Sequence, residues 1–221
     1  MKISDIIMEE TLEELIGIKN KVKDLPKPQS EFDRKNRIMH SHGIKWYQVM
    51  IDNGFQKLGS GMQATVWSHA NLPYVLKLFR SADLAYVNWT KVAMANKDNP
   101  HMPKFISSGI VRITQDMAAI RMEPLHEMKG QFLKVYKISN KLLTFNAPPS
   151  QSIEHVKYMP EYNKYGEYER FEKYVKDNPN WLAALDITWN FMNSTGHMND
   201  FHPGNCMMRG ADTIVITDPV S

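Results

Sequence analysis

Residues 54–80 constrain the fold most strongly, because they change abruptly from helical spacing to short apolar runs separated by turn residues. GFQKLGSGMQATVWSH is followed by LPYVLKLF, and glycine and proline bound each β-rich run, which predicts a strand, a glycine-rich turn and two more strands. A helical stretch at 82–97 and two further strand signals, GIVRIT and MAAIRME, come next. The sequence therefore predicts five short strands and one helix between residues 54 and 123.

The flanking regions are predicted to be mostly helical. Apolar residues fall at helical spacing in 4–25 and 32–51. Helices are also expected from about residue 166 and over 179–193, the latter with Asn178 as its N-cap and Pro179 at its first position. Residues 126–165 are polar and stay unassigned; PPSQS in this segment indicates a loop, and the segment has the character of an insertion. The end of the chain reads as loop, strand, turn and strand.

Composition excludes several classes of protein. Of 221 residues, 43% are hydrophobic and 23% charged, which is typical of a globular domain or two small lobes. The net charge of +3 is spread along the chain, so we expect no nucleic-acid partner. No apolar run is long enough to span a membrane, and the N-terminus lacks an export signal. The single cysteine fits a reducing compartment. These features predict a cytoplasmic protein with no membrane partner.

The last 23 residues, NDFHPGNCMMRGADTIVITDPVS, concentrate oxygen-bearing side chains. A hairpin centred near Ala211 would bring Asn205 and Asp218 side by side, and Asp200 lies five residues before Asn205. Carboxylate and amide oxygens are ligands for Mg²⁺. Two carboxylates at such a site suit phosphoryl transfer, one holding the metal and the other orienting a nucleophile.

The spacing Asp-x₄-Asn, with a second Asp thirteen residues later, matches the catalytic loop and metal-binding aspartate of protein-kinase-like enzymes. A surface loop with two incidental acids is the alternative, because Asp and Asn are common in turns.

The other parts of a kinase site can be sought near the glycine-rich turn. Gly59-Ser60-Gly61 with Val66 resembles the kinase glycine-rich loop, although Ala64 replaces its third glycine. Lys77 follows in an apolar strand, where it could bind the α- and β-phosphates. A simple hairpin turn and a solvent-facing lysine are the plain alternatives for these two features.

AIRMEPL, after the last of the five strands, fits the hinge of such a fold. Glu123 could offer its backbone carbonyl, and Leu125 its N–H, to an adenine edge, and Met207 could form an apolar floor beneath the base. Each methionine alone is more simply explained as core. The order of glycine-rich loop, lysine, hinge, helix, Asp-x₄-Asn and Asp is what favours the kinase interpretation.

The chain resembles protein-kinase-like proteins, and more narrowly the early serine/threonine protein kinases of T-seven-type podoviruses. The matching blocks are GFQKLGSGMQATVWSHANLPYVLKLF and DFHPGNCMM…ITDPVS, roughly a quarter of the chain. The resemblance implies an α+β, minimal bilobal kinase-like fold. Its parts would be a helical extension at 1–53, a five-stranded antiparallel N-lobe at 54–125 and a reduced, mostly helical C-lobe at 126–221.

The resemblance also implies a function: an early bacteriophage enzyme in the host cytoplasm that phosphorylates host proteins on serine and threonine, with ATP and Mg²⁺, and that could phosphorylate itself. Asp200 would orient the acceptor hydroxyl, Asn205 and Asp218 would hold Mg²⁺, and Lys77 would neutralise phosphate charge. His202 would contact the transferred phosphate or simply bond to the loop backbone. The nucleotide would contact Leu58, Gly59, Ser60, Gly61, Val66, Lys77, Glu123, Leu125 and Met207.

Several departures from the family pattern shape the expectation. No glutamate lies in the helix after Lys77, and Asp83 is the nearest acid. Pro219-Val220 follows Asp218 in place of Phe-Gly, and no activation segment follows. We therefore expect a minimal kinase without a phosphorylation-gated loop, in which the end of the chain forms the floor of the active site and the helices of 1–51 replace part of the C-lobe.

Two other functions remain open. DFHPGN also suggests a small-molecule phosphotransferase of the aminoglycoside or choline kinase type, whose cationic substrate could be attracted by acids in 154–172, unless these simply form a solvated helix face. The absent glutamate would also suit a kinase-like binder that sequesters a host factor.

Overall fold

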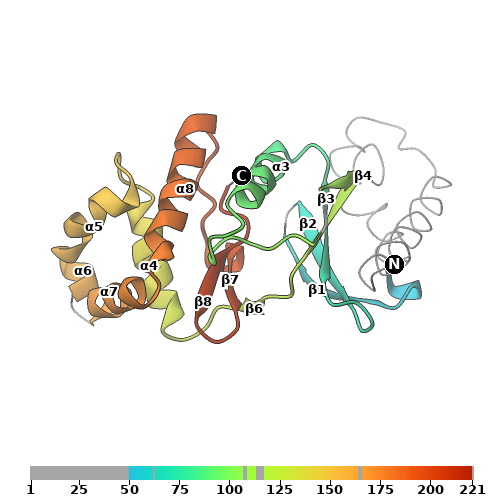
Figure 1. Ribbon diagram of the computed structural model, residues 1–221, viewed down its shortest axis with the longest axis horizontal. Coiled ribbons are helices and arrows are strands. Elements are labelled where there is room, and N and C mark those ends of the chain that lie inside the picture. Colours follow the sequence, from blue (N-terminus) through green and yellow to red (C-terminus); the bar gives the residue numbers. More distant parts are fainter. Residues whose placement is uncertain (1–49, 62, 107–108, 113–116, 164–165, 221) are drawn as a thin grey trace. The chain divides into compact units, whose positions relative to one another are not determined.

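A computed structural model of the chain describes residues 50–61, 63–106, 109–112, 117–163 and 166–220 (Figure 1). Within these ranges the chain forms two compact units. The first comprises residues 50–83 and 105–122, and the second comprises 84–104 and 123–220. The molecule is α+β, as expected, whereas the helices expected at 4–25 and over most of 32–51 lie outside the described residues.

The first unit is a five-stranded antiparallel sheet, which confirms the five expected strands (Figure 1). The strands are β1 (Phe55–Ser60), β2 (Ala64–His69), β3 (Val75–Arg80), β4 (Val111–Arg112) and β5 (Met117–Met122). Their order is β1-β2-β3-β5-β4, and every neighbouring pair is antiparallel. β1, β2 and β3 follow one another closely in the sequence, so short turns can join these neighbours in the sheet.

The β1–β2 hairpin places the glycine-rich stretch at its closed end. Gly59 lies opposite Val66 and Ser60 opposite Thr65, and the register shifts just before Gly59. The N–H of Gly61 donates to the carbonyl of Ala64 at 2.8 Å. The predicted turn is therefore confirmed.

The core of the first unit forms where large apolar side chains of β1, β2, β3 and β5 meet. Its buried members are Met50, Phe55, Trp67, Leu76, Leu78 and Ala119, with Leu72 and Met117 packed against them. Lys77 lies in the same strand as Leu76 and Leu78, but its side chain alternates to the other face of the sheet.

The second unit contains most of the helices and a three-stranded sheet of order β6-β7-β8. Its elements are α3 (Leu84–Ala95), β6 (His126–Glu127), α4 (Phe132–Leu142), α5 (Pro149–Lys157), α6 (Pro160–Asn163), α7 (Glu167–Asp177), α8 (Asn180–Thr195), the 3-10 helix η1 (Pro203–Asn205), β7 (Cys206–Arg209) and β8 (Thr213–Ile216). The helices expected at 82–97 and from about residue 166, and the closing strand–turn–strand, are thereby confirmed.

The described part of residues 126–165 is largely helical, and the prediction of a loop at PPSQS is wrong. Helix α5 begins within that motif, at Pro149, which is buried. Proline at the first helical position forgoes only an N–H that would have no partner inside the helix. The extended Pro148 before it, with φ −53° and ψ 143°, gives the chain its entry into the helix.

The N-cap expected at Asn178 is also wrong. Its side-chain amide donates backward to the carbonyl of Tyr174 at 3.1 Å, at the end of α7, and α8 begins at Asn180. Asn178 therefore closes the preceding helix, because a side chain between two helices can bond to either.

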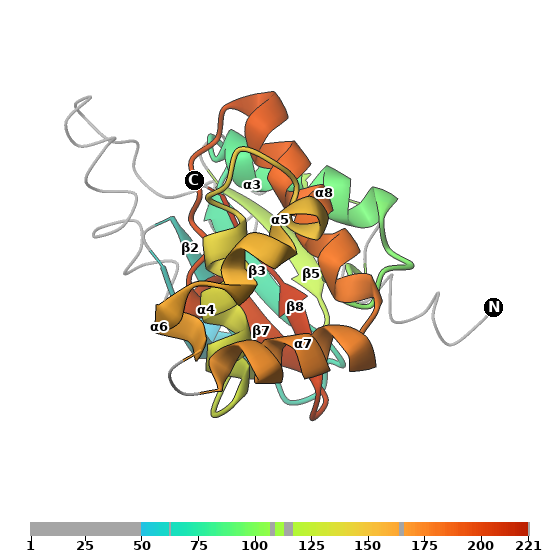
Figure 2. The same cartoon turned by 90° about the vertical axis from the view of Figure 1, so that its left-hand side faces the viewer.

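Tryptophan N–H groups join separate elements of the second unit. Trp89 of α3 donates to the carbonyl of Thr217 at 3.2 Å. Trp181 of α8 donates to the hydroxyl of Ser139 in α4 at 3.1 Å. Figure 2 shows α4 and α7 crossing in front of the β7–β8 hairpin, with α5 and α8 beside them. The large indoles fill the interior while their N–H groups stay paired.

Among the described residues, none of the helices has the length and apolarity needed to cross a membrane.

Candidate active site

The β7–β8 hairpin brings Asn205 close to the last residues of the chain. Cys206 pairs with Ile216, so the hairpin is centred on Ala211 as expected. Both the N–H and the hydroxyl of Thr217 donate to the carbonyl of Asn205 at 2.9 Å. Asn205 thus lies opposite Thr217, one residue earlier than the expected partner Asp218.

The backbone of Asp200 is hydrogen-bonded to the segment that follows β8. Its N–H donates to the carbonyl of Pro219 at 2.9 Å, and Asn199 forms a bridge with Val220. The residue that follows Asp218 is therefore bonded directly to Asp200. This antiparallel contact brings the loop before β7 and the segment after β8 together.

The side chain of Asn205 completes the arrangement. Its Nδ2 donates to the carbonyl of Asp200 at 2.8 Å and to Oδ2 of the same residue at 3.3 Å. Because Nδ2 faces Asp200, Oδ1 is the atom of the Asn205 amide that is left to act as a ligand. The structure therefore brings Asp200 and Asn205 into direct contact and places Asp218 next in the chain to residues that bond to both of them.

Asn205 and Asp218 carry oxygen atoms of the kind that Mg²⁺ takes as ligands. Within the described ranges no cluster of three or more His, Cys, Asp or Glu side chains could hold a metal. Mg²⁺ needs no such cluster, since it is usually bound by one or two carboxylates together with water and substrate phosphates. Asn205 and Asp218 supply ligands of that kind, an amide oxygen and a carboxylate.

His202 bonds to its own loop and still leaves one ring nitrogen available. Its Nδ1 accepts a hydrogen bond from the N–H of Gly204 at 3.1 Å. A Cβ on Gly204 would lie 2.9 Å from Cε1 of the same ring, so only glycine lets the histidine pack this way. With Nδ1 as acceptor, the neutral ring carries its proton on Nε2. The side chain is exposed, so both roles expected for His202 are compatible.

In the first unit, Lys77 lies in the middle of the sheet. It pairs with Val66 of β2 and Ile120 of β5, and only 7% of its surface is exposed. Leu58, by contrast, is 60% exposed. A Cβ at Gly59 or Gly61 would meet nothing within 4 Å, so the chain's own packing does not require either glycine.

The segment after β5 is held by an ion pair that sequence reasoning missed. Arg209 of β7 binds the carboxylate of Glu123 through Nε, at 2.7 Å to Oε2, and through Nη2. The same guanidinium donates to the carbonyls of Pro100 and Met102. Oε1 of Glu123 also accepts from the N–H of Lys104 at 2.8 Å. The carboxylate of Glu123 is therefore structural, a role the sequence did not suggest.

The expected hinge residues Glu123 and Leu125 and the expected floor residue Met207 all lie near the β6–β7 pairing. His126, which follows Leu125, pairs with Met208. Met207 is half-buried and shares a face of β7 with Arg209, while Cys206 and Met208 are buried on the other face. Glu123, Leu125 and Met207 thus belong to one region of the second unit.

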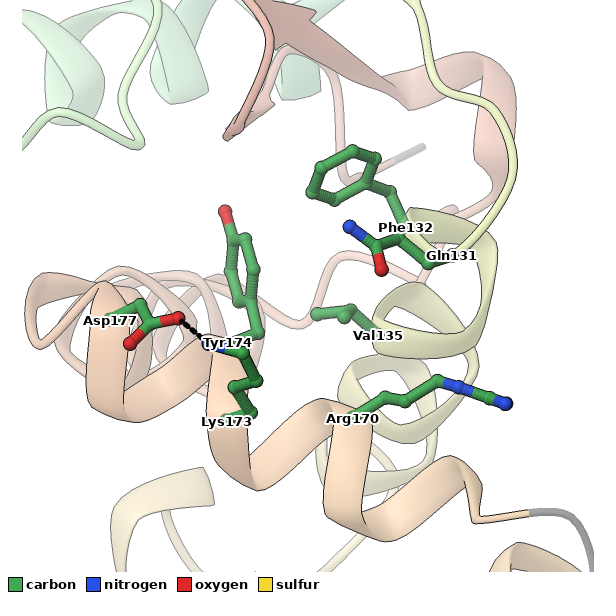
Figure 3. A pocket seen from close by; sticks show the side chains of 7 residues that line it. All are labelled: Gln131, Phe132, Val135, Arg170, Lys173, Tyr174 and Asp177. Atoms are coloured by element: carbon green, nitrogen blue, oxygen red, sulfur yellow. Dashed lines mark hydrogen bonds and ion pairs between the residues drawn. The ribbon is translucent and has the colours of Figure 1, made fainter.

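The described residues also form a hollow away from these side chains, between α4 and α7 (Figure 3). Its lining residues are Gln131, Phe132, Val135, Arg170, Lys173, Tyr174 and Asp177. Its volume of about 90 Å³ is well below the roughly 300 Å³ of a typical ligand site. None of the expected site residues lines it.

Comparison of the chain with models of known protein families, and with the sequences of curated proteins, found no match. The case for a function therefore rests on the residues and contacts of the chain itself.

Proposed function

We propose that this chain is a Mg²⁺-dependent kinase that transfers the γ-phosphate of ATP to serine and threonine hydroxyls of host proteins, as the bacteriophage resemblance implies. In this proposal the first unit corresponds to the N-lobe of a kinase-like fold and the second to its C-lobe. The observation that carries the proposal is the contact of Asn205 with Asp200, beside the segment that contains Asp218.

That contact matters because it assigns different tasks to residues with similar side chains. The amide of Asn205 donates to Asp200 and so turns its oxygen away from that residue. A metal ligand and an acceptor-orienting carboxylate must be close without competing for one position.

The first unit supports the proposal independently. In kinases, the lysine that binds the phosphates lies on the third strand of the N-lobe, after a glycine-rich hairpin. Lys77 lies on β3, directly opposite Val66 at the end of such a hairpin. Lys77 thus has the same position in the order of strands as that lysine.

The proposed residues divide the reaction among them. Asp200 would accept a hydrogen bond from the acceptor hydroxyl and receive its proton, while the hydroxyl oxygen forms a bond to the γ-phosphorus. The bond from that phosphorus to the β–γ bridging oxygen breaks, and ADP leaves. Asn205 and Asp218 would hold Mg²⁺, whose charge offsets that of the phosphates. Lys77 and Nε2 of His202 would contribute further hydrogen bonds to phosphate oxygens.

The main alternative is transfer to a small cationic acceptor. Four of the acids considered for that role, Glu154, Glu161, Glu169 and Glu172, are exposed. Glu167 is not available, because it is buried and paired with Lys134 and Lys137, which lower the pKa of its carboxyl group. A chain that only sequesters a host factor is the other alternative.

The test is incubation of the purified chain with γ-labelled ATP and Mg²⁺, with bacterial lysate proteins or with small aminoalcohols and aminoglycosides as acceptors. We expect labelled serine and threonine residues in protein bands, and no labelling by Asp218→Ala. Labelling of small acceptors only would favour the alternative enzyme. Absence of both ATP binding and transfer would contradict the proposed activity.

A further inference from the structure

Helix α4 lies against the loop that contains Asp200 and contacts both neighbours of that residue. The ring of Tyr136 stacks on the ring of Phe201, with centroids 5.5 Å apart and an interplanar angle of 15°. The Tyr136 hydroxyl donates to the carbonyl of Phe201 at 3.0 Å. Phe201 is 3% exposed, so this contact anchors the residue that follows Asp200 in the interior.

The residue before Asp200 is held by the next turn of the same helix. Nδ2 of Asn199 donates to Oδ1 of Asn140 at 3.3 Å, and Nδ2 of Asn140 donates to the Tyr136 hydroxyl at 3.4 Å. Asn140 and Tyr136 are four residues apart, so they share a face of α4.

These bonds close into a ring that includes both chain neighbours of Asp200. Oδ1 of Asn199 accepts from the N–H of Phe201 at 2.8 Å. The donors therefore run from Asn199 to Asn140, to Tyr136, to the Phe201 carbonyl, and back from the Phe201 N–H to Asn199. Each side-chain group acts in its ordinary sense as donor or acceptor. Asp200 lies in the chain between two members of this ring, Asn199 and Phe201.

The helix that supplies two members of this ring is itself fixed. Val135, Ile138 and Leu142 on α4 are buried, and Trp181 of α8 donates to the Ser139 hydroxyl. Burial, and then the proximity of Cys206, raise the pKa of Tyr136, so its hydroxyl keeps the proton that it donates.

We propose that Tyr136 and Asn140 are positioning residues for phosphoryl transfer, which hold Asp200 in its reactive orientation by gripping Asn199 and Phe201. This inference rests on the proposed function, and it assigns a purpose to a segment that the sequence left unassigned. The helix fixes the backbone on both sides of Asp200 and so restricts where its carboxylate can lie.

The kinetic test uses Tyr136→Phe, which keeps the stacked ring and removes the donor. Transfer from labelled ATP should show a kcat lowered roughly fivefold to tenfold with KM for ATP unchanged, since misorientation acts on the chemical step. Asn140→Ala should behave alike. In an Asp200→Asn background Tyr136→Phe should have no further effect, because the residue it positions is already lost. Additive losses would overturn the positioning role.

A second readout does not depend on activity. Hydrogen–deuterium exchange of the peptide covering 198–205 should be faster in Tyr136→Phe than in the wild type. It should be unchanged in Tyr168→Phe, a buried tyrosine of α7 that serves as the matched control. Unchanged exchange at 198–205 would overturn the inferred grip. Faster exchange with unaltered kcat would overturn its role in catalysis, and a wild type without transfer activity would instead contradict the proposed function.

Discussion

His101 shows how one buried side chain can make the second unit sensitive to pH. Its Nδ1 lies 2.7 Å from the carbonyl of Ile214 and must donate to it. Its Nε2 has no partner among the described residues and is enclosed near Trp181 and Tyr174. Burial, and then the charge of Arg209, lower the pKa of the ring. The folded chain therefore holds His101 neutral.

The consequence is a loss of stability in mild acid. The pKa of His101 in the folded chain lies below the unfolded value of about 6.5. Below about pH 6.5 the unfolded chain therefore binds a proton that the folded chain does not bind. The free energy of unfolding should thus be fully retained at pH 7 to 8 and decrease below about pH 6.5, by at most ~1.4 kcal/mol per pH unit from this site.

Urea unfolding at pH 5, 6, 7 and 8 checks this effect. His101→Gln, which can still donate to Ile214 but cannot be protonated, should flatten the dependence, while His126→Gln on the exposed strand β6 should not. Equal slopes in the wild type and His101→Gln would show that the proton binds elsewhere.

At the scale of secondary-structure elements, the turn residues between strands made the strands predictable. Helices α4 and α5 were not predicted, because their sequences are polar. Glycines and prolines separate the strands of 54–80, so the residues next to each strand indicate where it ends. Helices α4 and α5 instead rely on packing against α7 and α8. Their exposed faces are polar, and PPSQS resembles a loop in isolation, although it begins a helix.

The residues of the candidate site likewise differ in whether local sequence could predict their positions. Asp200, Asn205 and Asp218 could be placed together from the sequence, because a hairpin pairs residues at known separations. The side-chain role of Glu123 could not, since its partner Arg209 is 86 residues away and nothing local links them. Tyr136 and Asn140 escaped notice for the same reason.

The Glu123–Arg209 pair should stabilise the segments it joins. The two side chains are 15% and 22% exposed, and the guanidinium also serves two carbonyls. Arg209→Ala leaves Glu123 without its ion-pair partner and should lower the free energy of unfolding by about 2–3 kcal/mol.

Chemical denaturation with a matched control checks this value. The exposed pair of Lys173 and Asp177, one helical turn apart, should contribute less than about 0.5 kcal/mol, so Lys173→Ala should be nearly silent. If Arg209→Ala proved as mild as Lys173→Ala, the pair would not be a structural brace.

At the scale of the whole molecule, each unit contributes a different half of the proposed chemistry. The first unit carries the glycine-rich hairpin and the buried Lys77, which the proposal assigns to the phosphates. The second carries the oxygen ligands, the ring of hydrogen bonds that includes both chain neighbours of Asp200 and the pair that holds the segment after β5.

The central claim is that Asp200 takes part in phosphoryl transfer from ATP. The most direct test is the single-turnover rate of transfer from γ-labelled ATP to a protein acceptor in Asp200→Asn, with Asp212→Asn as control, since Asp212 is an exposed acid at the opposite end of the same hairpin. We expect Asp200→Asn to slow transfer by a factor of at least ~100, while Asp212→Asn matches the wild type. Equal rates in Asp200→Asn and the wild type would contradict the account.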